Sequence, residues 1–450
     1  MNNINSIKDN IVGKKISVLG SGISGQGAAS LAHHLGAIVL LSDNTKTNNL
    51  NLISDKIEIE FKHTSRCLDS DLVIISPGID PSTSDIVKKI INDKIPIVSE
   101  IEFGFWMTNS PIIAITGSNG KSTVVELVNS IFKKKYNNVI LGGNIGISFC
   151  MNIYKELKSG FKSIHILELS SFQLQNIHDF KPQLSCILNI TRDHIKRHGN
   201  FENYCKDKLK IVKNSDKKSY IVFNQDDPVL NKFFNQNSEA IPFSIKNISN
   251  NLYVKSNKIY CSKTSKQIIN QKKTNLPGLH NLSNLIAAIQ IAKIYKINNI
   301  LIKSAVEEFK PLLHRMEILD IKSNITFIND SKGTNLVSTM AAVESIANKT
   351  LLILGGYSDE EINMDTIKKI SCKEYIYKIV CYGEIGKVIS KKIKKSNYQK
   401  MFSDAVLHAI KSAIPNSTLL LSPGFKSFDQ FNSFEERGNT FKKIVFKHFA

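Results

Sequence analysis

The sequence is organised around one segment, Pro111-Ile-Ile-Ala-Ile-Thr-Gly-Ser-Asn-Gly-Lys-Ser-Thr123. Its β-branched residues 112–115 predict a buried strand, and the glycines that follow predict a turn. Ser122 is the predicted N-cap of the next helix. A strand, a glycine-rich turn, a lysine, a hydroxyl and a helix in this order are typical of a phosphate-binding loop. The spacing Gly-x-x-Gly-Lys-Ser-Thr is two residues shorter than the common form, so the segment matches a variant of it.

The residue types of this loop suit phosphate chemistry. Gly117 and Gly120 allow backbone N–H groups to point into one concavity, and the helix N-terminus adds positive potential. Lys121 is long enough to reach the outer phosphates of a nucleotide, and the hydroxyl of Ser122 or Thr123 is a ligand for Mg²⁺. The sequence therefore predicts a nucleotide triphosphate site here.

Length and composition bound the remaining possibilities. A chain of 450 residues predicts two to four domains, and 42% hydrophobic with 22% charged residues is typical of a soluble globular protein. No segment approaches the about 18 apolar residues of a membrane span, and the N-terminus lacks a signal-peptide pattern. The seven cysteines show no paired metal spacing, which indicates reduced thiols in a cytoplasmic protein.

The net charge of +20 raises the question of nucleic-acid binding. The lysines are spread along the chain without interleaved aromatic residues, as in Lys133-Lys-Lys135. We therefore expect no nucleic-acid partner. A positive field would still steer phosphate-bearing substrates toward the protein.

A second glycine-rich turn lies near the N-terminus, after a predicted strand at 15–19. Gly20-Ser-Gly-Ile-Ser-Gly25 opens a predicted helix at 23–35, and a second strand at 37–41 leads to Asp43. This is the fingerprint of a dinucleotide-binding turn, for which NAD is one ligand. Its physical content is a tight turn that holds a diphosphate, so any nucleotide diphosphate also qualifies.

Strands and helices alternate along the whole chain, which predicts parallel doubly wound sheets. The predicted strands at 71–75, 163–168 and 184–190 deliver Ser76, Glu168 and His194 to their carboxyl ends. Ligands bind at this edge of an open α/β sheet, and a carboxylate beside a phosphate loop is a candidate Mg²⁺ ligand. Lys208 falls in a helical stretch, where a lysine ordinarily lies on a solvated face.

The motifs together resemble the Mur ligases, the ATP-dependent amide ligases of peptidoglycan precursor synthesis. The resemblance covers nearly the whole chain and is carried by Thr116-Gly-Ser-Asn-Gly-Lys-Ser-Thr123, Glu168-Leu-Ser-Ser-Phe-Gln173, Asn189-Ile-Thr-x-Asp-His194, Leu279-His-Asn281-x-x-Asn284, His314-Arg-Met-Glu317 and Asn329-Asp-Ser-Lys332. Within the family, Gly20–Gly25, Ser76-Pro-Gly78 and the segment from Leu421 to Gly438 are similar to the D-glutamate-adding branch.

The resemblance implies an α/β chain of three domains. Residues 1–99 would form a Rossmann-like UDP-binding domain, residues 100–311 a central ATP-binding domain with the phosphate loop, and residues 312–450 a Rossmann-like domain for the amino acid. It also implies a cytoplasmic enzyme, which we expect to be a monomer. The implied substrates are UDP-N-acetylmuramoyl-L-alanine, D-glutamate and ATP, with two Mg²⁺ ions.

The resemblance also implies roles for individual residues. The catalytic residues would be Lys121, Glu168, His194 and Lys208. The metal ligands would be Ser122, Glu168, His194 and Lys208, with Lys208 carried as a carbamate. ATP would contact Gly117, Ser118, Asn119, Gly120, Lys121, Ser122, Thr123, Asn281, Asn284, Arg315, Asp330 and Lys332. The UDP substrate would contact Gly22, Ser24, Asp43, Asn44, Thr45, Ser76, Asn144 and Ser170. D-Glutamate would contact Lys332, Thr334, Ser427, Phe428 and Phe434.

The chain departs from the family pattern at several positions. The family usually places a Lys or Arg after Gly355-Gly356, where this chain has Tyr357-Ser-Asp-Glu-Glu361, and Lys426 is a candidate replacement. Lys196 stands where an Asp is common, and Gly333 replaces an Ala. Two alternatives therefore stay open: another amide ligase of this superfamily, and a nucleotide-binding homologue with impaired glutamate use.

Overall fold

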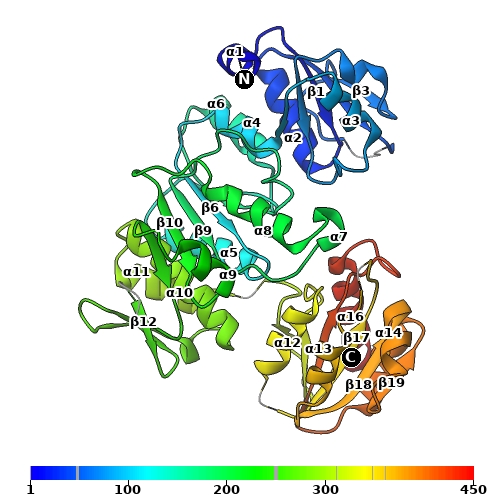
Figure 1. Cartoon of the computed structure of the whole chain (residues 1–450). Helices are drawn as coiled ribbons and strands as arrows, with labels where there is room; N and C mark the ends of the chain where they lie inside the picture. The colour runs from blue at the N-terminus through cyan, green and yellow to red at the C-terminus, as the bar shows by residue number, and fades with distance from the viewer. Residues whose placement is uncertain are drawn as a thin grey trace. The chain divides into compact units, whose positions relative to one another are not determined.

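We describe the protein from a computed structural model, which covers residues 2–46, 50–247, 252–310, 312–346, 348–359 and 361–449. The chain forms two compact units. Figure 1 shows the helices and strands of the whole chain. The first unit holds Met1–Ile269 and Asn284–Val306, and the second holds Asn270–Ser283 and Glu307–Ala450. Within the described ranges, no helix has the length and apolar character needed to cross a bilayer.

The first sheet is parallel and has five strands in the order β3-β2-β1-β4-β5. This order places β1 in the centre, so the glycine turn after β1 opens at the middle of the carboxyl edge. Its elements are α1 (Asn2–Asp9), β1 (Lys15–Leu19), α2 (Ile23–His34), β2 (Ile38–Asp43), β3 (Glu58–Phe61), η1 (Ser65–Leu68), β4 (Leu72–Ile75), α3 (Asp85–Asn92) and β5 (Ile97–Ser99).

The second sheet of this unit is parallel and has six strands in the order β11-β10-β9-β6-β8-β7. The fully buried β6 lies between β8 and β9, so the turns after these three strands are neighbours. The strands are β6 (Ile112–Thr116), β7 (Val139–Gly143), β8 (Ile164–Glu168), β9 (Leu184–Ile187), β10 (Tyr220–Asn224) and β11 (Ala240–Phe243). The helices are α4 (Glu100–Trp106), α5 (Lys121–Lys133), α6 (Phe149–Ser159), α7 (Ile195–His198), α8 (Phe201–Leu209), η2 (Lys210–Val212) and α9 (Pro228–Phe234).

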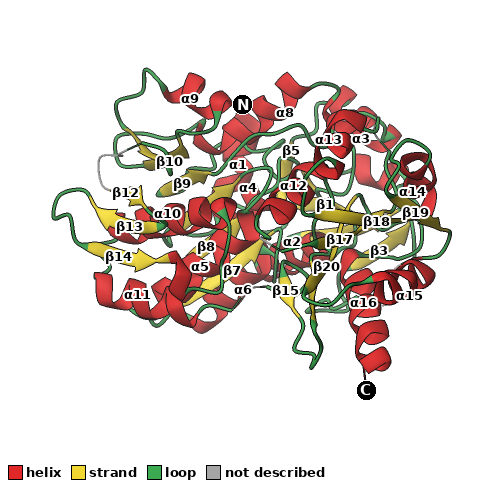
Figure 2. Cartoon of the chain, turned by 90° about the horizontal axis from the view of Figure 1, so that it is seen from below, coloured by secondary structure: helices red, strands yellow, loops and turns green. Residues whose placement is uncertain are grey.

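A small three-stranded sheet and two helices follow in the chain (Figure 2). Its strands β12 and β13 are antiparallel. The elements are β12 (Leu252–Lys255), β13 (Lys258–Cys261), β14 (Gln267–Asn270), η3 (Gln271–Lys273), α10 (Leu279–Ile294) and α11 (Asn299–Glu308).

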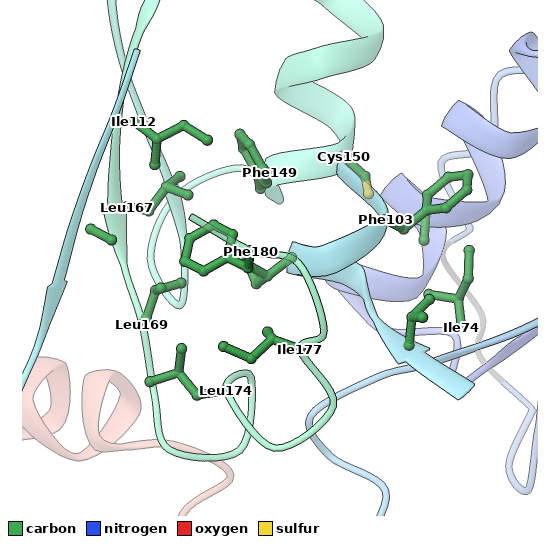
Figure 3. Packing of buried hydrophobic residues seen from close by; sticks show 14 of the residues in the cluster. Ile74, Phe103, Ile112, Phe149, Cys150, Leu167, Leu169, Leu174, Ile177 and Phe180 are labelled. Atoms are coloured by element: carbon green, nitrogen blue, oxygen red, sulfur yellow. The ribbon is translucent and has the colours of Figure 1, made fainter. Parts of the chain in front are cut away.

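One continuous hydrophobic core runs through the first unit, from Ile74 in β4 to Leu167 in β8. Figure 3 shows Phe103 of α4 and Phe149 of α6 between these strands. The loop after β8 contributes Leu169, Leu174, Ile177 and Phe180 to the same cluster. This loop is therefore fixed by packing, although it carries the candidate residues that follow Glu168.

The second unit contains a six-stranded sheet in the order β15-β16-β20-β17-β18-β19. Its pairs are parallel apart from β15 with β16. The elements are β15 (Glu317–Ile318), β16 (Ile325–Asn329), α12 (Leu336–Glu344), β17 (Thr350–Gly355), α13 (Met364–Ser371), β18 (Ile376–Tyr382), α14 (Gly383–Ser390), β19 (Ser396–Gln399), α15 (Phe402–Ser412), β20 (Ser417–Gly424) and α16 (Phe434–Phe449).

The predicted α/β class with parallel sheets is confirmed, but Ser122 and His194 do not lie where the sequence predicted. Helix α5 begins at Lys121 with Gly120 as its N-cap, so Ser122 lies inside the helix. Strand β9 ends at Ile187, so His194 lies seven residues beyond it in a loop. The domain bounds at 99/100 and 311/312 stay predictions, and Pro311 lies outside the described residues.

Candidate active site

The phosphate loop joins β6 to α5 in the geometry that its glycines allow. Gly120 has φ +86°, a left-handed conformation that L side chains rarely adopt. A Cβ built at this position would lie 2.4 Å from Oδ1 of Asn284, a residue predicted to contact ATP. Glycine is therefore required here by both backbone angle and space, and Asn284 lies directly against the loop.

The backbone of the phosphate loop is hydrogen-bonded to the side chain of Asn189, a residue with no role predicted from the sequence. Oδ1 of Asn189 accepts a hydrogen bond from the Asn119 backbone N–H over 2.8 Å, and its Nδ2 donates to the Asn119 carbonyl over 3.0 Å. Nζ of Lys121 donates to the carbonyls of Gly117 at 2.7 Å and Ser118 at 2.9 Å. The lysine thus folds back over the loop that it serves.

Glu168 ends β8 beside this loop and is 2% exposed. Its Oε1 accepts a hydrogen bond from Nδ2 of Asn144 over 2.8 Å, whereas its buried Oε2 has no hydrogen-bond partner. An unpartnered buried carboxylate oxygen is costly, and a bound cation would satisfy it. Glu168 therefore fits the predicted role of a Mg²⁺ ligand.

Lys208 contradicts the expectation of a solvated face, because it is buried, with 2% exposure. Its Nζ donates to the Gly117 carbonyl over 2.9 Å and lies 4.8 Å from the centre of the Tyr204 ring. Burial and the charge of Lys121 lower the pKa of Lys208 well below its usual value, and Asp193 and Glu168 only partly oppose them. A depressed pKa increases the neutral amine, which is the form that reacts with CO₂.

His194 is the N-cap of α7 and has φ +54°. Its Nε2 lies 3.7 Å from Oδ2 of Asp193, and its ring meets the edge of Phe172 with a centroid separation of 5.0 Å. Among the described residues, no group of three or more His, Cys, Asp and Glu side chains is arranged to hold a metal ion. A site with few protein ligands still suits Mg²⁺, because this ion is usually held by one or two carboxylates together with substrate phosphates and water.

The glycine turn at residues 20–25 is hydrogen-bonded to Asp43. Oδ2 of Asp43 accepts hydrogen bonds from the backbone N–H of Ser21 at 2.6 Å and from its hydroxyl at 2.8 Å, and Oδ1 accepts from Thr45. Burial raises the pKa of Asp43, but these bonds outweigh it and hold that pKa below its usual value. The hydroxyl of Ser76 donates to the Gly20 carbonyl over 3.2 Å, so the two predicted loops lie together.

The other residues predicted to contact the UDP substrate lie on the same unit. Gly22 is the exposed N-cap of α2, Ser24 is half-buried and Asn44 is exposed. The hydroxyl and N–H of Ser170 both bond to Oε1 of Gln173. Gln173 also lines a small pocket together with Ser76, Ile79, Glu100 and Arg197.

In the second unit, Asp330 follows β16 and is buried. Burial raises the pKa of Asp330 to about 6, although a hydrogen bond from Ser422 and the charge of Arg315 oppose this shift. Lys332 has its Nζ 5.3 Å from the centre of the Phe434 ring. The structure therefore brings Asp330 near Arg315, and Lys332 near Phe434.

The predicted D-glutamate residues differ in exposure. Ser427 is buried, Thr334 and Phe434 are half-buried, and Phe428 is 64% exposed. Arg437, which has no role predicted from the sequence, has a fully buried guanidinium that donates to Ser331, Tyr382 and Phe425. The position of Arg437 within the quoted C-terminal motif was the available signal.

Lys426, the candidate replacement for the missing basic residue, is bound to an acid. Its Nζ lies 2.8 Å from Oδ1 of Asp359, and its backbone pairs with Tyr357. Glu360 of this acidic segment lies outside the described residues.

Asn281, predicted to contact ATP, belongs to the second unit and donates from Nδ2 to the Pro277 carbonyl over 2.8 Å.

Comparison with known proteins gives consistent relatives along the whole chain. Residues 115–292 match the model of the Mur ligase middle domain. The chain is 36% identical to the UDP-N-acetylmuramoylalanine–D-glutamate ligase of Thermoanaerobacter pseudethanolicus, over 96% of this chain and 98% of the relative. It is 35% identical to the enzyme of the same name from Christiangramia forsetii, over 96% and 99% of the two chains.

Solved structures share the fold at low sequence identity. The UDP-N-acetylmuramate-alanine ligase of Thermotoga maritima superposes with a TM-score of 0.63 at 17% identity, over 97% of this chain and all of that one. The MurF ligase of the same organism, solved in complex with ADP, gives a TM-score of 0.61 at 15% identity, over 98% and 97%.

Proposed function

The chain belongs to the UDP-N-acetylmuramoylalanine–D-glutamate ligases of the Mur ligase family, and we propose that it joins D-glutamate to UDP-N-acetylmuramoyl-L-alanine. ATP is cleaved to ADP and phosphate in this reaction, which makes a precursor of peptidoglycan. The proposal also takes the enzyme to be a cytoplasmic monomer with domains at 1–99, 100–311 and 312–450. The free state of all seven cysteines supports a reducing compartment.

The reaction proceeds in two transfers. The L-alanyl carboxylate attacks the terminal phosphorus of ATP, the bond to the bridging oxygen breaks, and ADP leaves. The amine of D-glutamate then attacks the acyl carbon, a C–N bond forms, and the carbon–oxygen bond to phosphate breaks as the amine loses a proton. Phosphorylation is needed because a free carboxylate is a poor acylating agent. Catalysis is then mainly positioning and charge neutralisation.

The first unit supplies the groups for phosphoryl transfer. The loop 117–123 would hold the ATP phosphates, with Lys121 exchanging its bonds to backbone carbonyls for bonds to phosphate oxygens. Ser122, Glu168, His194 and Lys208 would hold Mg²⁺, which neutralises phosphate charge when bound. The unpartnered Oε2 of Glu168 and the lowered pKa of Lys208 support these roles, the latter through a carbamate. Asn284 supports the loop from its side, as the spacing at Gly120 indicates.

The second turn of this unit would hold the UDP substrate through Gly22, Ser24, Asp43, Asn44, Thr45 and Ser76, with Asn144 and Ser170 further along. In the second unit, Asn281, Arg315, Asp330 and Lys332 would serve ATP. Lys332, Thr334, Ser427, Phe428 and Phe434 would serve D-glutamate. The cation–π contact of Lys332 with Phe434 supports one shared surface for these two residues.

The observation that carries this proposal is the presence of two glycine turns in one unit, each opening a helix. The test is ADP release by the full chain with UDP-N-acetylmuramoyl-L-alanine and a panel of amino acids. Release that requires D-glutamate supports the proposal. Release with L-lysine or diaminopimelate but not with D-glutamate supports another amide ligase, and binding of both nucleotides without turnover supports an inactive homologue.

A further inference from the structure

We infer that Ser171, His198 and Asp207 form a hydrogen-bonded positioning network that fixes the phosphoryl-transfer groups of the first unit. The inference rests on the proposed function, because Glu168, His194 and Lys208 are the groups that it would position. None of the three network residues has a role in that proposal.

The network is a continuous chain of hydrogen bonds through one imidazole. Nδ1 of His198 lies 2.9 Å from Oδ2 of Asp207, and its Nε2 lies 3.0 Å from the hydroxyl oxygen of Ser171. The imidazole side chain is fully buried. It stacks on Phe172 with 12° between the planes and a centroid separation of 5.2 Å. Both ring nitrogens are therefore engaged, and packing fixes the plane of the ring.

Each network residue lies close in sequence to one of the groups to be positioned. Ser171 follows Glu168 by three residues in the loop after β8, and His198 follows His194 by four residues at the end of α7. Asp207 directly precedes Lys208 on α8. One imidazole thus ties together the three segments that carry Glu168, His194 and Lys208.

Helix α8, which carries Asp207 and Lys208, also contacts the phosphate loop. The hydroxyl of Tyr204 on α8 lies 2.8 Å from the hydroxyl of Ser118, and Nζ of Lys208 donates to the Gly117 carbonyl. Asp207 is further fixed by Gln175 at 3.0 Å and Lys210 at 2.7 Å. A shift of α8 would therefore move the loop and Lys208 together. Residues that orient ligands in this way commonly change metal affinity or activity when replaced.

A second buried histidine, His165 in strand β8, offers a matched control. Nε2 of His165 lies 2.9 Å from Oε2 of Glu156, and the His165 ring is fully buried. Its Nδ1 has no hydrogen-bond partner, so this pair ends at the histidine. His165 lies near the amino end of β8, whereas Glu168 lies at the carboxyl end. The pair has the chemistry of His198 and Asp207 without the connection to the candidate site.

The experiment compares His198→Gln, Ser171→Ala and Asp207→Asn with His165→Gln, all in the full chain. We expect the three network variants to lower kcat and to raise the Mg²⁺ concentration for half-maximal rate by about 10-fold or more. The KM for D-glutamate should change much less. Calorimetry of ADP binding in the presence of Mn²⁺, which needs no turnover, should show a comparable loss of affinity. His165→Gln should lower the melting temperature and leave both readouts near wild type.

Some outcomes would overturn the network. One is that the network variants keep the wild-type Mg²⁺ requirement and the wild-type Mn²⁺–ADP affinity. The other is that they lose no more activity and ADP affinity than His165→Gln does. If His198→Gln does not fold, Ser171→Ala removes only one hydroxyl and decides the question. If the wild-type enzyme releases no ADP with D-glutamate, the proposed function fails, and the comparison of Mn²⁺–ADP affinities still tests the network.

Discussion

Nζ of Lys208 donates a hydrogen bond to the carbonyl oxygen of Gly117 over 2.9 Å, across 91 residues of sequence. This bond places an amine from α8 on the turn that follows β6. Asp193 and Glu168 are close enough to influence its charge. The helical pattern alone indicates a solvated face for Lys208, whereas the family resemblance implies a site residue, and the structure buries it beside the phosphate loop.

Lys208 should carry a carbamate in the active enzyme. Burial and Lys121 lower the pKa of Lys208, which increases the fraction of neutral amine, the form that attacks CO₂. The resulting anion would pair with a metal ion. We expect activity to fall in CO₂-free buffer and to return with bicarbonate, and ¹³C-bicarbonate to give a carbamate signal by NMR.

Lys206 provides the control for this prediction, because it lies on the same helix with its side chain 66% exposed. Lys206→Ala should keep the carbamate signal, and Lys208→Ala should lose it. Full activity without CO₂, together with no carbamate signal, would exclude the modification.

Lys121→Ala should reduce ADP formation by about a hundred- to a thousand-fold, the usual cost of losing one preorganised charge-stabilising group. Lys121 lies at the first position of α5, over the phosphate loop. Lys133 in the last turn of the same helix is the control, because Lys133→Ala leaves the loop untouched. Initial rates at saturating substrates measure the effect, and near wild-type rates for Lys121→Ala would remove the loop from the mechanism.

Glu100 should make the protein less stable as the pH rises. Burial raises the pKa of Glu100 from 4.5 to about 7, so the folded state binds more protons than the unfolded state between these values. The contribution of Glu100 to the free energy of unfolding is therefore highest below pH 4.5. It falls as the pH rises from there to about 7 and is constant above. Glu100→Gln keeps an acceptor for the Cys150 N–H and removes the charge.

At pH 8 the Glu100→Gln variant should exceed wild type in free energy of unfolding by on the order of 3 kcal/mol, and at pH 4.5 the two should agree. Thermal unfolding of both proteins across this pH range measures the difference. Parallel profiles would show that Glu100 does not titrate in the folded protein with the raised pKa.

Lys426 should contribute to D-glutamate binding by exchanging Asp359 for a substrate carboxylate. A hydrogen bond to a charged group is worth about 1.5–3 kcal/mol, so Lys426→Ala should raise the KM for D-glutamate about 10-fold or more. Asp359→Asn should lower that KM, because it frees the lysine. Lys373→Ala is a matched control, since Lys373 pairs with Glu344 elsewhere in the second unit. A KM unchanged by Lys426→Ala would assign this pair to the fold alone.

The sequence predicted the parallel α/β sheets and both glycine turns, because glycine spacing and strand patterns are local signals, but it did not predict the small sheet with antiparallel β12 and β13. Gly117 and Gly120, for example, predict a tight phosphate-binding turn, and Gly120 has the left-handed backbone that glycine permits there. The burial of Lys208 and the role of Asn189 depend on contacts between distant segments, which periodicity does not carry. Ser122 was misplaced as an N-cap because Gly120 already occupies that position with a left-handed conformation.

The central claim is that the turns at 20–25 and 117–123 hold two different nucleotides. A crystal structure with UDP-N-acetylmuramoyl-L-alanine and a non-hydrolysable ATP analogue tests it most directly. We predict the UDP diphosphate at the Gly20–Gly25 turn and the triphosphate at residues 117–123. An empty turn, with its nucleotide bound elsewhere, would contradict the account.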